Sequence, residues 1–310
     1  MHTVSNILAG TDFSESAEAA LIEAHRIASS VGANLTVLHV VHDELVEILK
    51  QKLGMPEAEL LQLASERLDK HLHELLGETE NVKTEILIGC PFIELFRATK
   101  NHAADLLVLG SGGSETDGVH AGILARRCVR KVPCKVLLVR KRQREPFSQV
   151  VACVDFSENS NEAIELAAQV AHQDGAELHL LHVCRPVVPS VHGERGAFAG
   201  TKFFDISLPP YPEMDYAQKQ KDKLDELGAE LLGEKFPDLK IESHVFTDGH
   251  RPSHGIVAFL KDRDAELVVL GTRGRTGVRS LLIGTTAERI VDHSPCSVLA
   301  IKPPGFKFDL

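Results

Sequence analysis

The stretch "LGTRGRTGVRSLLIGTT", residues Leu270 to Thr286, decides how the rest of the chain is interpreted. Four apolar residues end at Leu270, and such a short apolar run predicts a strand buried on both faces. Glycines follow the strand, and a helical pattern then runs from Ala287 to Asp292. A helix N-terminus offers unpaired N–H groups and a partial positive charge. The stretch therefore predicts a cradle for an anion such as phosphate.

Seven residues of this stretch could contact a ligand that carries phosphate. The glycines would let the backbone approach it, the threonines would donate hydroxyl hydrogen bonds, and the arginines would add positive charge. The pattern is not a Walker A loop, because the chain contains no Gly-Lys pair. The alternative is a glycine-rich loop that binds nothing, with arginines that are merely solvated. The seven residues are Gly271, Arg273, Gly274, Arg275, Gly284, Thr285 and Thr286.

The chain repeats itself once. The segment "ILAGTDFSESAEAALIEAHRIASSVGANLTVLHVV" begins at Ile7, and the similar segment "VACVDFSENSNEAIELAAQVAHQDGAELHLLHVC" begins at Val151. The offset between the copies is 143 residues at Asp12 and Asp155, and it reaches 161 at the glycine-rich loop. The second copy therefore carries 18 extra residues between its second and fourth strands.

Two copies of about 150 residues are the size of two ordinary domains. We expect the domains to span residues 1–143 and 148–310, with the polar stretch from Arg140 to Ser148 as their boundary. In each copy strand-like runs alternate with helical patterns, which predicts a parallel sheet covered by helices on both faces. The fold class is therefore α/β, with two doubly wound sheets. Ligands of such sheets bind at the carboxyl ends of the strands.

The expected elements are clearest in the first copy. Ser14 precedes an apolar stripe at helical spacing and is a plausible N-cap, and Pro91 suits the first position of a helix. We expect helices at 14–31, 57–76 and 91–101. We expect strands at 6–9, 34–40, 82–88, 106–109 and 135–139.

Composition and charge narrow the classes of function. The net charge of −10 gives no overall basic field, and the aromatic fraction of 5% weakens a base-stacking model, so we expect no nucleic-acid partner. The six cysteines include no C-x-x-C pair, and His250 and His254 lack a third ligand, so no metal site is predicted. We find no signal peptide and no apolar run long enough to cross a membrane. We expect a cytoplasmic protein without a membrane span.

The full pattern G-x2-G-x9-G-[ST], between a buried strand and a helix, resembles the nucleotide-binding signature of the universal stress protein family. The repeat is similar to that of the tandem-domain members. The resemblance implies two five-stranded domains of the adenine nucleotide alpha hydrolase type, each with strand order 3-2-1-4-5. It also implies that the ligand is ATP, or else ADP or AMP, with or without Mg²⁺.

The same resemblance assigns roles outside the glycine-rich loop. It implies that Val154 and Asp155 lie near the base and the ribose, and that the backbone at Val183, after the second strand, reads adenine. A carboxylate such as Asp155 could accept hydrogen bonds from ribose hydroxyls. The alternative for Asp155 is to cap the helix that begins near Ser157.

Family members pair through their last strands, so the resemblance implies that the two domains pack as an intramolecular pseudo-dimer. The stretches 136–139 and 298–301 are apolar, and an unpaired apolar edge would be a liability. Whole chains could in addition form a homodimer.

The first copy departs from the nucleotide-binding pattern. Only eight residues separate Gly113 from Gly122, Ile123 replaces the hydroxyl residue, and the loop carries two carboxylates and no arginine. We therefore expect a degenerate first site and a single nucleotide per chain.

The extra residues of the second copy include an aromatic segment. The stretch from Phe198 to Tyr216 holds five aromatic residues, and its three prolines argue against a helix there. It could be an aromatic flap over the adenine, or a loop that packs on its own domain.

The sequence thus predicts a protein of the cytoplasmic stress response or its regulation that binds an adenine nucleotide in its second domain. No catalytic residue is predicted, and hydrolysis of ATP would at most be slow because no general base is evident beside the cradle, with Asp155 as the one arguable candidate. The alternative is an interaction protein that binds a lipid-like or other small molecule through the first domain and the aromatic segment.

Overall fold

The computed structural model describes residues 4–77, 79–112, 121–140, 146–184, 213–247, 251–274 and 283–308. Several sequence-based interpretations lie outside these residues. They concern Gly113 and the acidic loop behind it, Arg275, His250 and residues 198–212 of the aromatic segment. None of the described helices is long and apolar enough to cross a membrane.

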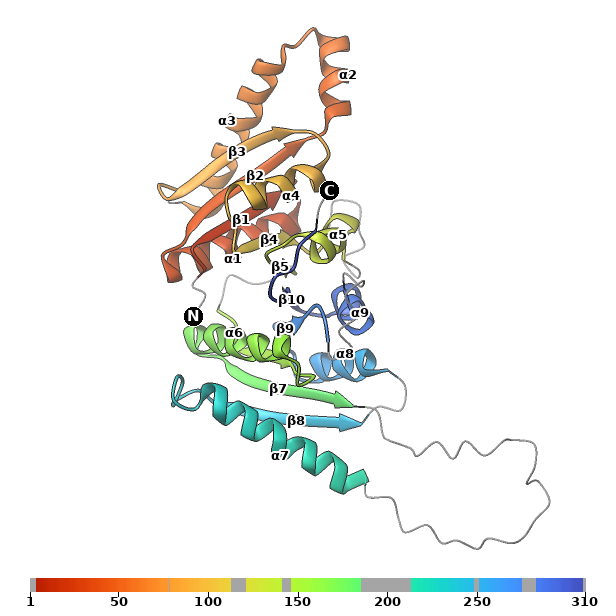
Figure 1. The fold of residues 1–310 in the computed structure, drawn as a ribbon. Coiled ribbons are helices and arrows are strands. Elements are labelled where there is room, and N and C mark those ends of the chain that lie inside the picture. The colour runs from red at the N-terminus through yellow and green to blue at the C-terminus, as the bar shows by residue number, and fades with distance from the viewer. Residues whose placement is uncertain are drawn as a thin grey trace, which may run out of the picture.

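The ten strands in the described part of the chain form one continuous sheet, in the order β3-β2-β1-β4-β5-β10-β9-β6-β7-β8. We call β1 to β5 with their helices the first half, and β6 to β10 with their helices the second half (Figure 1). The strands of the first half are β1 (Asn6–Thr11), β2 (Asn34–Val41), β3 (Val82–Ile88), β4 (Leu106–Gly110) and β5 (Lys135–Val139). Those of the second half are β6 (Gln149–Cys153), β7 (Glu177–Cys184), β8 (Ile241–Thr247), β9 (Leu267–Gly271) and β10 (Ser297–Ile301).

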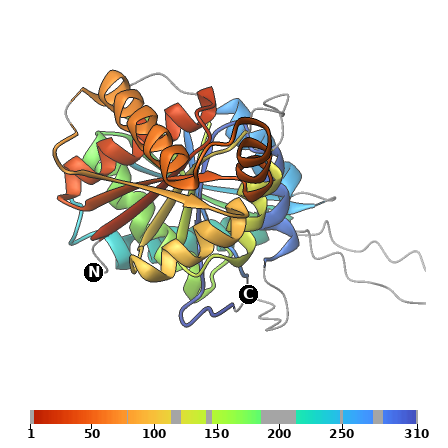
Figure 2. The same ribbon diagram turned by 90° about the horizontal axis from the view of Figure 1, so that it is seen from above.

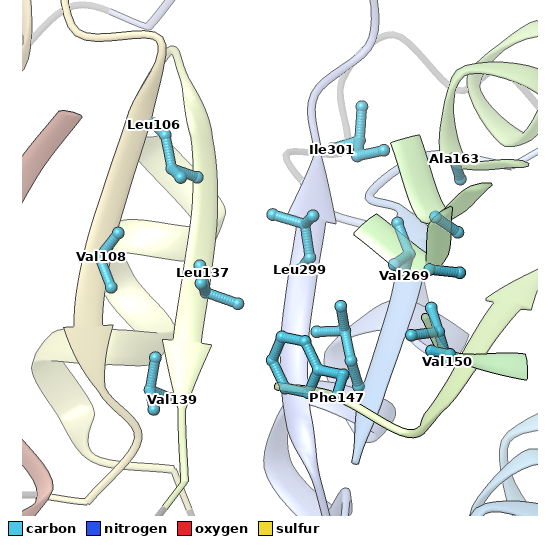
Figure 3. Close-up of a cluster of buried hydrophobic side chains, with 14 of the residues drawn as sticks. Leu106, Val108, Leu137, Val139, Phe147, Val150, Ala163, Val269, Leu299 and Ile301 are labelled. Carbon is cyan, nitrogen blue, oxygen red and sulfur yellow. The ribbon is translucent and has the colours of Figure 1, made fainter. Parts of the chain in front are cut away.

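The two halves join through their last strands. Within each half the strands are parallel and follow the predicted order 3-2-1-4-5, whereas β5 and β10 pair antiparallel, with Leu137 opposite Leu299. Leu137, Val139, Leu299 and Ile301 are buried on one face of this seam (Figure 3). The predicted pairing is therefore confirmed. The prediction of two separate sheets needs one correction, since the seam makes a single sheet of them.

Helices cover both faces of the sheet. One face carries α1 (Glu15–Val31), α3 (Glu57–Leu76), α6 (Glu158–Asp174) and α7 (Glu213–Leu232). The other carries α4 (Pro91–Asn101), α5 (Ile123–Lys131), α8 (Pro252–Asp262) and α9 (Thr285–His293). Figure 2 shows the strands of both halves fanned between these two layers. Each face has one apolar cluster that includes residues of both halves, so the core is continuous across the seam.

Polar contacts reinforce the seam at its borders. On one face, Arg26 of α1 lies 2.5 Å from Asp174 at the end of α6, and the other oxygen of Asp174 accepts a hydrogen bond from the backbone of Phe147. On the opposite face, α5 and α9 lie side by side. Arg126 there approaches Asp292 at 3.2 Å, and Arg130 approaches Glu288 at 3.5 Å. The two arginines come from the first half and both carboxylates from the second.

The structure corrects three local predictions. Helix α2 (Asp43–Leu53) was not predicted, because it buries only Val46 and so lacks a broad apolar stripe. Helix α7 begins at Glu213, so Tyr216 at the end of the aromatic segment is helical despite the prolines before it. Val183 lies within β7, opposite Phe246, and not after the strand.

Candidate functional site

Asp155 follows β6 and organises the turn into α6. Its Oδ1 accepts hydrogen bonds from the backbone N–H and the hydroxyl of Ser157, at 3.1 and 2.5 Å. Ser157 is the N-cap of α6 and in turn accepts from the backbone N–H of Ser160. Phe156, which lies between Asp155 and Ser157, has φ +61°, a backbone conformation that costs energy for a bulky residue. The helix-capping alternative is thus realised in part, since Asp155 positions the residue that caps α6.

The first two glycines of the cradle are explained by close packing. A Cβ atom on Gly271 would lie 2.5 Å from the side-chain nitrogen of Asn159, which projects from α6. A Cβ atom on Gly274 would lie 2.5 Å from Oδ2 of Asp155. A larger residue at either position would require the side chain of Asn159 or of Asp155 to shift. These glycines therefore bring the end of β9 against the start of α6.

The third glycine serves a different purpose. Gly284 is the N-cap of α9 with φ −74°, and among the described residues a Cβ atom there would meet nothing nearer than the carbonyl oxygen of Thr272 at 3.6 Å. Neither backbone strain nor crowding by the described residues requires glycine at this position. Because Gly284 has no side chain, the first backbone N–H groups of α9, beginning with those of Thr285 and Thr286, are left open toward the cleft described below.

Nine of the ten predicted site residues line one cleft of about 350 Å³ in the second half. The tenth, Arg275, lies outside the described residues. The wall of the cleft is apolar and includes Leu181, Ile256, Leu270 and Ile290. The nine residues are Val154, Asp155, Val183, Gly271, Arg273, Gly274, Gly284, Thr285 and Thr286. The cleft lies at the carboxyl ends of β6 and β9, the place where doubly wound sheets bind ligands.

Two of these residues also make contacts within the protein. The backbone N–H of Val154 donates to Leu181 and its carbonyl accepts from His182, so both of its backbone polar groups already have partners. The guanidinium of Arg273 lies over the ring of Phe306, 5.4 Å from its centroid. Arg273 is thereby held by the chain segment that follows β10.

Three residues that the sequence analysis missed support the cleft. Asn159 donates to the carbonyl oxygens of Arg273 and Ile301, at 3.3 and 3.4 Å, and so fastens α6 to the loop after β9. Thr272 is fully buried and donates through its backbone and hydroxyl to the carbonyl of Ile301. His182 holds the carbonyl of Val154 at 2.7 Å. The repeated Asp-Phe-Ser triplet, residues 12–14 and 155–157, was the signal that could have marked this turn.

The first half keeps a cleft at the equivalent place. It measures about 420 Å³ and is lined by Thr11, Asp12, Val40, Gly110 and Gly122, among others. At the start of α5, Ile123 and Leu124 stand where α9 has the two threonines, and Ile123 is 79% exposed. The first cleft thus has an apolar mouth in place of two hydroxyl groups.

Comparisons with known proteins agree with this architecture. The family model described as "Universal stress protein family" matches residues 3–140, 146–202 and 203–302. A universal stress protein of Mycolicibacterium smegmatis is 26% identical over 314 residues, which covers 97% of this chain and 98% of that protein. One of Methanocaldococcus jannaschii is 31% identical over 158 residues, 51% of this chain and 84% of that protein.

Among solved structures, a putative universal stress protein of Pseudomonas aeruginosa shares the fold. It is 18% identical, with a TM-score of 0.65 over 97% of this chain and 94% of that one. Since the family model matches nearly the whole length, in both halves, this chain belongs to the universal stress protein family.

Proposed function

We propose that the second-half cleft binds an adenine nucleotide, with ATP the first candidate and ADP or AMP the others. The observation that carries this proposal is the hydroxyl pair Thr285–Thr286 at the open N-terminus of α9, in the same cleft as Asp155. A phosphate placed there would accept hydrogen bonds from the first turn of α9 and meet its partial positive charge. The role we assign to the nucleotide is in the stress response or its regulation in the cytoplasm.

The rest of the nucleotide would lie along the remaining lining of the cleft. The carboxylate of Asp155 would accept from the ribose, and the base would lie against the apolar wall near Val183. Asp155 is the only carboxylate among the described lining residues, and its Oδ1 already accepts from Ser157. A Mg²⁺ ion would therefore arrive on the phosphates, because the described residues form no dedicated oxygen cage for it.

The test replaces the two threonines by the residues of the first half. We expect wild-type protein to bind one ATP per chain in calorimetry. The double substitution Thr285→Ile with Thr286→Leu should lower the affinity for ATP at least about tenfold, because hydrogen bonds to a charged group contribute about 1.5–3 kcal/mol. Helix α5 begins with the same Ile-Leu pair, so the variant should fold. Wild-type protein without ATP affinity, or a variant with unchanged affinity, would overturn the proposal.

A second candidate function concerns the first half. Its larger cleft has the exposed Ile123 and the partly buried Leu124 at the mouth, a surface suited to a small apolar ligand and not to phosphate. Ile123→Thr with Leu124→Thr should abolish binding of such a ligand and leave ATP binding in the second half unchanged. Equal effects on both ligands would show that the two clefts are not independent.

The two proposals assign one ligand site to each domain. We propose domain boundaries of 1–143 and 148–310. They are supported by the end of β5 at Val139 and the start of β6 at Gln149.

A further inference from the structure

A group of three side chains lies on the outermost strands of the second half, away from the cleft. His179 comes from β7, and Glu242 and His244 come from the edge strand β8. The register of the two strands places His179 opposite Glu242, and His244 follows two residues later on the same face. Both histidine rings pack against Phe259 of α8, so the group lies between the sheet and the carboxyl-terminal end of that helix.

One atom of each side chain points to a common centre. The distance from His179 Nδ1 to His244 Nε2 is 3.1 Å, that from His244 Nε2 to Glu242 Oε2 is 3.3 Å, and that from His179 Nδ1 to Glu242 Oε2 is 3.6 Å. Zn²⁺ binds imidazole nitrogen and carboxylate oxygen at about 2.0–2.2 Å, so two ligands of a tetrahedral ion lie about 3.3–3.5 Å apart. The triangle of ligand atoms therefore already has the size of one face of a zinc tetrahedron.

The outer hydrogen bond of His179 gives its ring the tautomer that a metal requires. Its Nε2 lies 2.7 Å from the side-chain oxygen of Gln149, and the amide nitrogen of Gln149 donates to Glu177. That amide orientation makes the oxygen of Gln149 an acceptor, so Nε2 of His179 carries the proton. The lone pair of His179 Nδ1 then faces the other two ligands, as in metal sites where the second ring nitrogen is held by a polar partner.

The exposure of the three side chains leaves the side of Glu242 open for a fourth ligand. The side chains of His179 and His244 are 1% and 14% exposed, whereas that of Glu242 is 48% exposed. Phe246 and Phe259 flank the ring of His244. A water molecule could complete the coordination from the solvent side.

The alternative that needs no metal is a hydrogen bond between two histidines at a charged sheet edge. In that case Glu242 would form an ion pair with Arg263, whose guanidinium lies 3.7 Å from the same Oε2. The fold itself does not need the imidazoles, however, because the first half builds the same strand pair without them. Register equates His179, Glu242 and His244 with Thr36, Lys83 and Glu85.

The first half uses its equivalent position for a simple ion pair. Glu85 there accepts from His102, at 2.7 Å, and His102 ends α4 as Arg263 ends α8. A single imidazole paired with a carboxylate thus suffices at this place in the fold. The second half instead gathers two imidazoles and a carboxylate, the ligand set of many zinc sites with one open position.

We propose that His179, Glu242 and His244 bind one Zn²⁺ ion, with the fourth position open to solvent. The described residues contain no other group of three such side chains with converging ligand atoms. The bound ion would tie the edge strand β8 to β7 and would displace Arg263 from Glu242.

The test uses the full chain without a histidine tag, freed of metal by a chelator and titrated with Zn²⁺ in a calorimeter. We expect one ion per chain, and Co²⁺ in place of Zn²⁺ should give the intense visible absorption of four-coordinate cobalt. Glu242→Gln should weaken Zn²⁺ at least tenfold and His244→Gln should abolish the stoichiometric site. Gln149→Met, which removes the hydrogen bond to His179 Nε2, should lower the affinity for Zn²⁺ about 10–100-fold.

His102→Gln is the matched control, because it removes the imidazole that pairs with Glu85 in the first half and should leave Zn²⁺ affinity unchanged. Glu242 is half-exposed, so its variant should keep the melting temperature of the metal-free protein. Zn²⁺ should also raise the melting temperature of the wild type and not that of His244→Gln. The proposal is overturned by wild-type protein without a stoichiometric site, or by variants at Glu242 and His244 that bind as the wild type does.

Discussion

The two halves of the molecule share their scaffold and differ where a ligand would lie. Both turn after their first strand with the same Asp-Phe-Ser triplet, and Phe13 and Phe156 have φ of 62° and 61°. Asp12 accepts from the backbone of Ser14 just as Asp155 accepts from Ser157. The start of α9 has two threonines, whereas α5 begins with isoleucine and leucine. Features shared by the halves therefore build the fold, and features unique to one half are the candidates for function.

The largest difference in stability between the halves is expected for substitutions of the glycine that ends the fourth strand of each half. A Cβ atom on Gly110 would lie 2.6 Å from backbone atoms of Ser16, whereas one on Gly271 would meet the side chain of Asn159. Backbone in α1 cannot yield as a side chain can. We expect Gly110→Ala to cost about 3 kcal/mol and Gly271→Ala about 1–2 kcal/mol in urea unfolding. A larger loss for Gly271→Ala would show that Asn159 is as rigid as the backbone.

The residue that follows the last strand also differs between the halves. Lys302 is 6% exposed, donates to the carbonyl of Val129, and burial lowers its pKa to about 7. Its equivalent, Arg140, stays charged at every ordinary pH. Between about pH 7 and 10.5 the unfolded chain holds a proton on Lys302 that the folded chain has lost, so stability rises with pH across this window.

Lys302→Met should remove this dependence on pH. Below pH 7 it should also stabilise the protein by about 1–3 kcal/mol, because it removes a buried charge. Arg140→Met is the control and should leave the slope of stability against pH unchanged. The measurement is the free energy of unfolding at several pH values, and an unchanged slope in Lys302→Met would contradict the prediction.

Substitutions of Asp12 and Asp155 can distinguish a structural role from a binding role. Asp12→Ala and Asp155→Ala each remove the same hydrogen bond to the backbone of a capping serine, so each should lose about 1 kcal/mol of stability. Asp155→Ala should in addition weaken ATP about tenfold, measured by calorimetry, whereas Asp12→Ala should not. Equal ATP affinities in the two variants would mean that Asp155 stabilises its turn and does not contact ATP.

The smallest effect is expected for the ion pairs between α5 and α9. Arg126→Ala removes a partly exposed pair with Asp292 and should cost about 0.5 kcal/mol at low salt, and less at high salt. Thermal melting at two salt concentrations measures this difference. A salt-independent loss would mean that the aliphatic part of Arg126 matters more than its charge.

Local sequence patterns predicted most of the fold, because its elements are long and regular. The helix at Glu57–Leu76 and the strand at Val82–Ile88 have the predicted bounds, and Ser14 is the N-cap of α1. Helix α2 was missed because its apolar residues Leu45, Ile48 and Leu53 stay exposed and form no core-facing stripe. Periodicity reports burial, so a helix that buries little leaves little trace in the sequence.

The candidate sites were predictable to different degrees, because only some of their residues are close together in the sequence. The glycine-rich loop and α9 are contiguous in sequence, so their spacing alone placed Gly284, Thr285 and Thr286 together. The packing role of Gly271 against Asn159 depends on how α6 crosses β9, which the sequence does not state. His179 and His244 are 65 residues apart, and only the register of β7 and β8 brings their rings together.

The charges of α5 and α9 favour the association of unlike halves over that of like halves. Arg126 and Arg130 occupy the positions in α5 that Glu288 and Asp292 occupy in α9, and each arginine meets the carboxylate of the other half. A symmetric pair of first halves would bring four arginines together, and a symmetric pair of second halves would bring four carboxylates together. Self-association of either half is thereby opposed, and association of unlike halves is favoured. Because both copies stand in one chain, this contact need not be self-complementary, as the contact of a homodimer must be, and its charges favour the unlike half as the partner.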